Sequence, residues 1–256
     1  MTLDAALFGR RPIRLFVFTR ATDAGTKVWR YCNSDRDLTI GGNTYTAAQI
    51  DRSEIKQTSE RAKDKITITM AYLRNPGAPE FPATQDLGDQ WFPFVPSSTI
   101  TVICMTTHAG EADPPAVEWM GQVTQPKFTD VELELTCEPT GSNDRARNQG
   151  AKWQRACWKT VYSTGLRGCN LDPDAFAVSA TLSGVSGLTL TASAFSGTAF
   201  TLAGGSLSWV NGDGLTERRQ IMTHTGSSIT VLYGSPDLAN GLAVTALPGC
   251  ERTWEA

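Results

Sequence analysis

The sequence predicts a mainly β protein, with two β-rich regions of barrel- or sandwich-like type joined by a short helix-loop element that carries cysteines. Three observations support this: short segments alternate apolar and polar residues, turn residues separate them, and a helical pattern occurs in one stretch only. A chain of 256 residues can form one large domain or two modest ones. We expect a hub domain over 1–140, the cysteine element over 141–174 and a C-terminal β domain over 175–256.

The first region contains several predicted strands. Residues 11–20 are rich in aromatic and β-branched side chains, and Lys65–Met70 alternates strictly, as a half-buried strand does. Gly41-Gly42-Asn43 between two short strands predicts a hairpin. In the segment 132–137, Cys137 shares the phase of the apolar residues, so a core thiol is the ordinary interpretation of this cysteine.

The stretch from Trp153 to Gly165 has the spacing of a helix. Apolar or small residues recur on one face, and Gly165 is a plausible stop because glycine adopts the left-handed conformation at little cost. The helix would place Cys157 on its buried stripe beside Trp153. Gly168 would then let the chain bend before Cys169, so that this element and the distant Cys250 form a covalent or metal staple.

The second β region, residues 176–250, is poor in charge. Serine and threonine alternate with apolar residues in strands such as Ser206–Val210, and glycine- and asparagine-containing turns separate them. Its charged residues are Asp213, Glu217, Arg218, Arg219 and Asp237. Such a surface is unusual for a free-standing domain and suits a module that packs against neighbouring subunits.

Composition limits the classes of partner. The formal net charge of −3 gives no polyelectrolyte signal, so no sequence-specific nucleic acid binding is expected. No secretory signal and no membrane-spanning apolar run are evident, so we expect no membrane partner and maturation in a reducing cytoplasm. In that compartment the six cysteines are better candidates for thiolate ligands or core residues than for disulfides.

Catalytic motifs are lacking. The histidines, His108 and His224, stand far from each other and from any recognised motif, and no nucleophile elbow, P-loop or dinucleotide fingerprint occurs. We therefore expect a protein that is not an enzyme. The spacing of Cys157, Cys169 and Cys250 lacks the paired knuckles of a zinc finger, so spacing by itself supports a metal site only weakly.

Several segments together resemble the tail-tip (baseplate) hub proteins of long-tailed phages, related to the minor tail protein L of phage lambda and to hub proteins of gene transfer agents. They are the segments 40–48 (IGGNTYTAA), 136–139 (TCEP), 153–173 (WQRACWKTVYSTGLRGCNLDP), 204–210 (GGSLSWV), 217–224 (ERRQIMTH) and 247–256 (LPGCERTWEA). The resemblance covers most of the chain, and the cysteine-bearing segments are its most specific part.

The resemblance implies a structural protein of the virion tail tip, assembled in the host cytoplasm. It would connect the distal tail ring to the central receptor-facing hub protein and self-associate, as a homotrimer. It also implies a 4Fe-4S cluster held by cysteines, and Cys157, Cys169 and Cys250 match three of its ligands. The family's fourth cysteine would fall just beyond Ala256. That leaves open a shortened sequence, substitution by Cys137, or a cluster that is incomplete or completed from elsewhere.

Two other classes remain in view. Soft thiolate ligands suit zinc as well as an iron–sulfur cluster, so the chain could be a zinc-stabilised β-rich binding or adhesin module. A tail-associated hydrolase that uses His108 or His224 is the third class.

Overall fold

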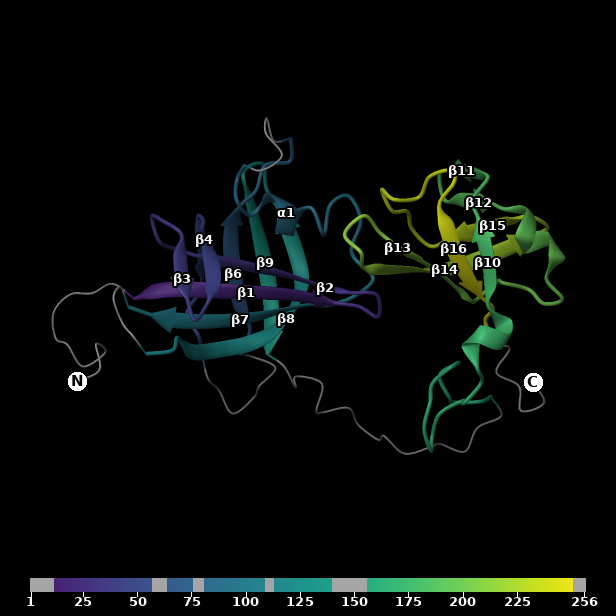
Figure 1. The fold of residues 1–256 in the computed structure, drawn as a ribbon, viewed down its shortest axis with the longest axis horizontal. Helices are drawn as coiled ribbons and strands as arrows, with labels where there is room; N and C mark the ends of the chain where they lie inside the picture. The colour runs from purple at the N-terminus through teal and green to yellow at the C-terminus, as the bar shows by residue number, and fades with distance from the viewer. Residues whose placement is uncertain (1–11, 57–63, 76–80, 109–112, 140–155, 251–256) are drawn as a thin grey trace. The chain divides into compact units, whose positions relative to one another are not determined.

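The structure is a computed structural model that describes residues 12–56, 64–75, 81–108, 113–139 and 156–250 (Figure 1). The predicted fold class is confirmed: the described residues are mainly β and form two separate sheets. The chain divides into two compact units. The first comprises Met1–Thr22 with Thr26–Arg145, and the second comprises Asp23–Gly25 with Ala146–Ala256.

The first unit contains a nine-stranded sheet in the order β3-β4-β2-β1-β7-β8-β9-β6-β5. Neighbouring strands are antiparallel except for β2 and β4, which are parallel. The strands are β1 (Ile13–Ala21), β2 (Thr26–Cys32), β3 (Leu38–Ile40), β4 (Asn43–Ala47), β5 (Ile50–Arg52), β6 (Ile66–Ala71), β7 (Ile100–Thr107), β8 (Ala116–Phe128) and β9 (Glu132–Pro139).

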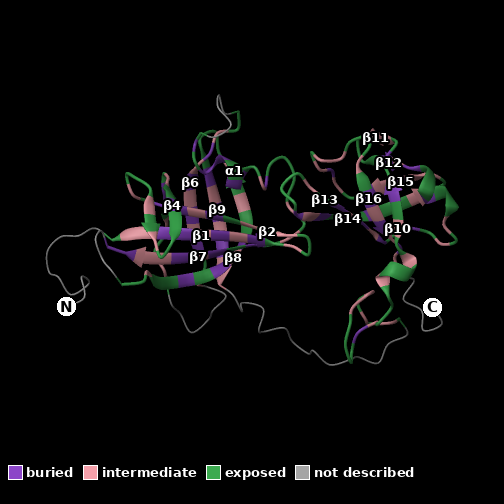
Figure 2. Cartoon of the chain, in the orientation of Figure 1, coloured by how far each residue is buried: buried purple, intermediate pink, exposed green. Residues whose placement is uncertain are grey.

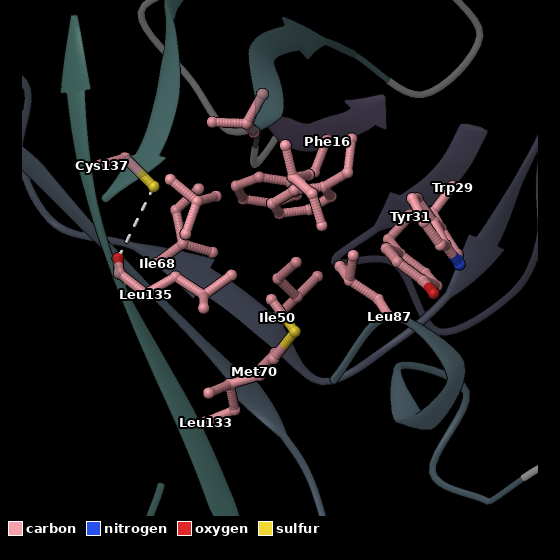
Figure 3. Packing of buried hydrophobic residues seen from close by; sticks show 14 of the residues in the cluster. Phe16, Trp29, Tyr31, Ile50, Ile68, Met70, Leu87, Leu133, Leu135 and Cys137 are labelled. Carbon is pink, nitrogen blue, oxygen red and sulfur yellow. Dashed lines mark hydrogen bonds between the residues drawn. The ribbon is translucent and has the colours of Figure 1, made fainter. Parts of the chain in front are cut away.

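The core of this unit follows from the alternation in its strands. In β6, Ile66, Ile68 and Met70 are buried, and the residues between them are not. In register, Ile66 stands opposite Cys137 and Ile68 opposite Leu135, so the buried residues of two strands share one face. Figure 3 shows this face packed with the aromatic side chains of β1 and β2.

The sheet curls so that its two ends approach each other. The segment between β4 and β5 is hydrogen-bonded on both sides: the Ala48 amide donates to the Cys32 carbonyl at 2.9 Å, and the Ala71 amide donates to the Gln49 carbonyl at 3.0 Å. Cys32 ends β2 and Ala71 ends β6, and these strands are far apart in the strand order. The curl encloses the core of the first unit.

Helices are scarce in the described part of the chain. The one α-helix there, α1 (Gln85–Gly88), is a single turn whose Leu87 joins the core of the first unit. Two 3-10 turns, η4 (Pro173–Phe176) and η5 (Ser193–Gly197), lie in the second unit. None of the helices in the described ranges has the length and apolar character needed to cross a membrane.

The second unit contains a seven-stranded sheet in the order β10-β16-β13-β14-β15-β12-β11. Along its strands buried residues alternate with exposed ones (Figure 2), and the buried set forms a core of its own. The strands are β10 (Val178–Thr181), β11 (Gly184–Ser186), β12 (Thr189–Thr191), β13 (Ser206–Val210), β14 (Thr216–Thr225), β15 (Ser228–Val231) and β16 (Ala243–Leu247).

A buried ion pair lies within this second core. Arg219 Nη1 and Glu217 Oε2 are 3.0 Å apart, and their side chains are only 2% and 5% exposed. The Arg219 guanidinium also donates to the Gly234 and Arg218 carbonyls and stacks over the rings of Trp209 and Tyr233. Two of the five charged residues in the segment 176–250 are thus withdrawn from the surface.

Candidate metal centre

Cys157, Cys169 and Cys250 lie in the second unit, and each is partly exposed. The first two stand on a loop of turns, residues 156–172, which we call the cysteine loop. The third directly follows Pro248-Gly249 at the end of β16. We describe the loop first, then its attachment to the segment that bears Cys250.

The cysteine loop is not the helix that the sequence predicts. Trp153 lies outside the described residues, and residues 156–165 form bends and turns. Ser163 accounts for part of this difference: its hydroxyl donates to the Thr160 carbonyl at 2.6 Å and accepts from the Cys169 amide at 3.0 Å. Such side-chain bonds to the backbone compete with helical hydrogen bonds. Tyr162, with φ +59°, also departs from helical geometry.

The second half of the loop is closed by Asn170. Its side-chain oxygen accepts from the Gly165 amide at 2.9 Å, and its side-chain nitrogen donates to the Gly165 carbonyl at 3.0 Å. Gly165 itself has φ +103°, so the left-handed backbone expected of this glycine is present although no helix precedes it. At Gly168 a Cβ would lie 2.5 Å from the Ser163 carbonyl oxygen, so only glycine fits before Cys169.

Tyr162 attaches the cysteine loop to the segment that ends in Cys250. Its hydroxyl donates to the Pro248 carbonyl at 3.0 Å. Burial raises the pKa of Tyr162, and the nearby thiols of Cys250 and Cys169 raise it further. Tyr162 thus lies within electrostatic range of both thiols, and its hydrogen bond to Pro248 connects the cysteine loop to the segment that ends in Cys250.

Ring contacts connect this site to the sheet. The Tyr162 and Phe176 ring centroids are 6.4 Å apart, and those of Phe176 and Phe200 are 6.2 Å apart. Phe200 packs against the second core. Tyr162 is not among the residues predicted from the sequence, where its position between Cys157 and Cys169 was the available signal.

Cys137 lies in different surroundings. It is fully buried in the core of the first unit, and its thiol donates to the Leu135 carbonyl at 3.7 Å (Figure 3). Burial raises the pKa of Cys137, and the neighbouring Cys104 adds to this effect. A metal ligand must be a thiolate, and this environment favours the neutral thiol. The placement agrees with the core interpretation drawn from its strand phase.

The remaining candidates are in structural positions. The His224 ring accepts from the Leu202 amide through Nδ1, at 3.1 Å, and its Nε2 lies 3.1 Å from the Phe195 carbonyl oxygen. His108 is buried in the first unit. Across the described ranges, no three Cys, His, Asp or Glu side chains gather in a way that could hold a metal ion. Cys169 and Cys250 both lie within electrostatic range of Tyr162, and the part of the chain that the structure describes gathers no complete ligand set around them.

Comparison with known proteins gives matches of two kinds, one to a sequence and one to a solved structure. No protein-family model matches the sequence. An uncharacterized protein of Xylella fastidiosa (strain 9a5c) is 58% identical over 181 residues, which cover 70% of this chain and 37% of that protein. The chain thus spans little more than a third of that relative's length.

The second match is to a solved structure described as the virion of a native gene transfer agent particle. The likeness covers 98% of this chain and 83% of the matching chain, with a TM-score of 0.73 and 17% identity. At this level of identity the match establishes the fold. The chain therefore shares its fold with a chain of that particle, and the expected membership of the hub family stays a prediction.

Proposed function

We propose that this protein is a structural component of a phage-like virion, located in the tail-tip hub. The observation that carries the proposal is the likeness of fold over 98% of the chain to a chain of a gene transfer agent virion. A match of this extent includes both β units rather than one widespread sheet motif. The low charge of the segment 176–250 supports the same conclusion, because such a surface suits contact with other subunits.

Within that role, the protein connects the distal tail ring to the central receptor-facing hub protein. It self-associates as a homotrimer and is assembled in the host cytoplasm before it joins the tail. These finer statements rest on the sequence segments that resemble tail-tip hub proteins, several of which form recognisable structural parts. The segment 204–210 contains β13, and the segment 217–224 lies within β14, including the buried pair of Glu217 and Arg219.

Deletion and complementation of the gene test the proposal. Particles from the deletion strain should lack complete tails, and a wild-type copy should restore them. Antibody against the protein should label the tail tip of the restored particles in electron micrographs, with antibody against the capsid as a control. Infectious, fully tailed particles without the protein would overturn the proposal.

We further propose that Cys157, Cys169 and Cys250 contribute to a 4Fe-4S cluster. In support, the three thiols belong to one unit and are partly exposed, and two of them neighbour Tyr162. Among the described residues no three ligands are gathered, so we expect the cysteine loop to change conformation when the cluster binds. The cluster would add folding free energy to a loop that otherwise has few buried contacts.

The test is iron and acid-labile sulfide content of anaerobically purified protein. We expect near-stoichiometric iron and sulfide and broad visible absorption, both lost in Cys169→Ser. Cys104→Ala is the matched control, because it removes a buried thiol of the first unit and should retain the iron. If the wild type contains zinc and no sulfide, the site is a zinc site and not an iron–sulfur cluster. If the wild type contains no metal, the proposal of a metal centre is refuted.

A further inference from the structure

The cysteine loop is held along its second part, residues 160–170. There the Ser163 hydroxyl accepts from the Cys169 amide at 3.0 Å, and the Asn170 side chain bonds twice to the backbone of one glycine. Side-chain bonds of this kind fix a turn without help from a helix or a sheet. Cys157 precedes this part of the loop. The backbone that carries Cys169 is therefore held by the loop itself.

The segment before Cys250 is held by close contact of two backbone stretches. A Cβ on Gly249, the residue before it, would lie 2.6 Å from the carbonyl carbon of Gly204. A Cβ on Gly205 would likewise overlap the Leu247 carbonyl oxygen, and only glycine allows so close an approach. The Gly204 amide donates to β14 and the Gly205 carbonyl accepts from it, both at 2.9 Å. The base of Cys250 is thus anchored on the sheet of the second unit.

Tyr162 joins these two held parts. It directly precedes Ser163, and its hydroxyl donates to the Pro248 carbonyl, two residues before Cys250, at 3.0 Å. Its ring centroid lies 6.4 Å from that of Phe176. Tyr162 has φ +59°, a conformation that is uncommon for a bulky side chain and persists where the surrounding contacts determine it. The hydroxyl and the ring together supply such contacts.

We infer that Tyr162 is a positioning residue that holds Cys169 and Cys250 as a preformed pair of thiols. Cys157 is then the ligand that joins the pair when a metal enters. The inference rests on the metal centre of the proposed function and deepens it, because it says which thiols meet the metal first. In support, burial raises the pKa of Tyr162, and the thiols of Cys250 and Cys169 raise it further. In the described ranges no three Cys, His, Asp or Glu side chains gather to hold a metal ion, so a third thiol has to arrive later.

Phenylarsine oxide tests for the preformed pair, because its arsenic bridges two neighbouring thiols. The arsenic-bound oxygen leaves as water with the two S–H protons, two As–S bonds form, and nothing is oxidised or reduced. The full chain, treated with a chelator and reduced with a phosphine, is titrated with the compound, and its mass is measured under native conditions. We expect one arsenic per chain, lost in Cys169→Ser and in Cys250→Ser and kept in Cys157→Ser.

Tyr162→Phe isolates the hydroxyl, because it keeps the ring beside Phe176. We expect it to raise the dissociation constant of the arsenical by about 5- to 10-fold, the effect of one neutral hydrogen bond. Alkylation of Cys169 and Cys250 by iodoacetamide needs one thiol only and should keep its wild-type rate, whereas general unfolding would change both readouts. Tyr233→Phe is the matched control. It removes a tyrosine hydroxyl from the same unit, keeps the ring against Arg219, and should bind the arsenical as the wild type does.

Three results would overturn the inference. They are a wild type that binds no arsenic, a Tyr162→Phe variant that binds it as tightly as the wild type, and a bridge that contains Cys157 in place of Cys169 or Cys250. Failure of the metal centre is read separately. A wild type that binds arsenic at Cys169 and Cys250 but takes up neither iron nor zinc supports the preformed pair and refutes the metal centre. A wild type with iron and sulfide whose Tyr162→Phe variant binds arsenic equally well supports the metal centre and refutes the role of Tyr162.

Discussion

Breaking the buried pair of Glu217 and Arg219 should lower the denaturant concentration at which the second unit unfolds. Glu217 Oε2 lies 3.0 Å from Arg219 Nη1, and the two side chains are 5% and 2% exposed. Glu217→Ala therefore leaves a buried guanidinium without its carboxylate. Removing one partner of a buried ion pair costs about 3–5 kcal/mol. Arg219 keeps its bonds to two carbonyls and its contact with the Tyr233 ring, 4.5 Å away, so we expect the lower end of that range, about 3 kcal/mol.

The assay is hydrogen exchange of the full chain in increasing urea, followed by mass spectrometry. Peptides from β13 and β14 should lose protection at lower urea in Glu217→Ala, while peptides from β6 and β9, in the other unit, should not change. Replacing both partners, Glu217→Leu with Arg219→Met, should recover most of the loss, because no buried charge remains. A loss below about 1 kcal/mol for the single variant would refute the argument, since exposed pairs already contribute that much.

Two further predictions concern the cysteines. In the native protein without metal, iodoacetamide should modify the partly exposed thiols and spare the buried ones, because alkylation requires an accessible thiolate. Peptide mass spectrometry measures the labelling of the partly exposed Cys157, Cys169 and Cys250 and of the buried Cys32, Cys104 and Cys137. Labelling of Cys137 at the rate of Cys169 would contradict its place in the core. The second prediction is that the free energy of unfolding of the first unit falls as pH rises above 9. Burial raises the pKa of Cys104 from 9.0 to about 12, so the unfolded thiol ionises first and stability is lost between these values. The loss is about 1.4 kcal/mol per pH unit for each such thiol, and Cys104→Ala should show a smaller slope in urea denaturation at pH 8 and pH 10. An identical slope in the variant would assign the loss to other groups.

Local signals in the sequence were sufficient to predict most of the strands and turns. The alternation of Lys65–Met70 corresponds to β6, and the pattern of Ser206–Val210 corresponds to β13. At the hairpin of β3 and β4, Gly41 and Gly42 both have positive φ, and Ile40 pairs with Asn43. These features depend on the residues themselves, because side chains alternate across a strand and glycine tolerates a left-handed backbone.

The expected helix shows where a local pattern is insufficient. The spacing of residues 153–161 fits one helical face, yet in the described part of that stretch the backbone forms turns. Ser163 and Asn170 satisfy the backbone of the cysteine loop with their side chains, and Tyr162 bonds to Pro248. A helix of this length in water depends on packing of its apolar face, and here tertiary contacts favour another conformation.

The sequence by itself determined the mainly β class, the strand segments, the turns and the low charge of the second region, because each depends on residue type and near neighbours. The strand phase of Cys137 already indicated a core position, whereas only the tertiary structure decided the environment of Cys157, Cys169 and Cys250. The pairing of β6 with β9 places Cys137 in a core, while Tyr162 brings Cys169 and Cys250 into one neighbourhood. Such pairings join distant segments, and the energy that selects them comes from burial of the whole core.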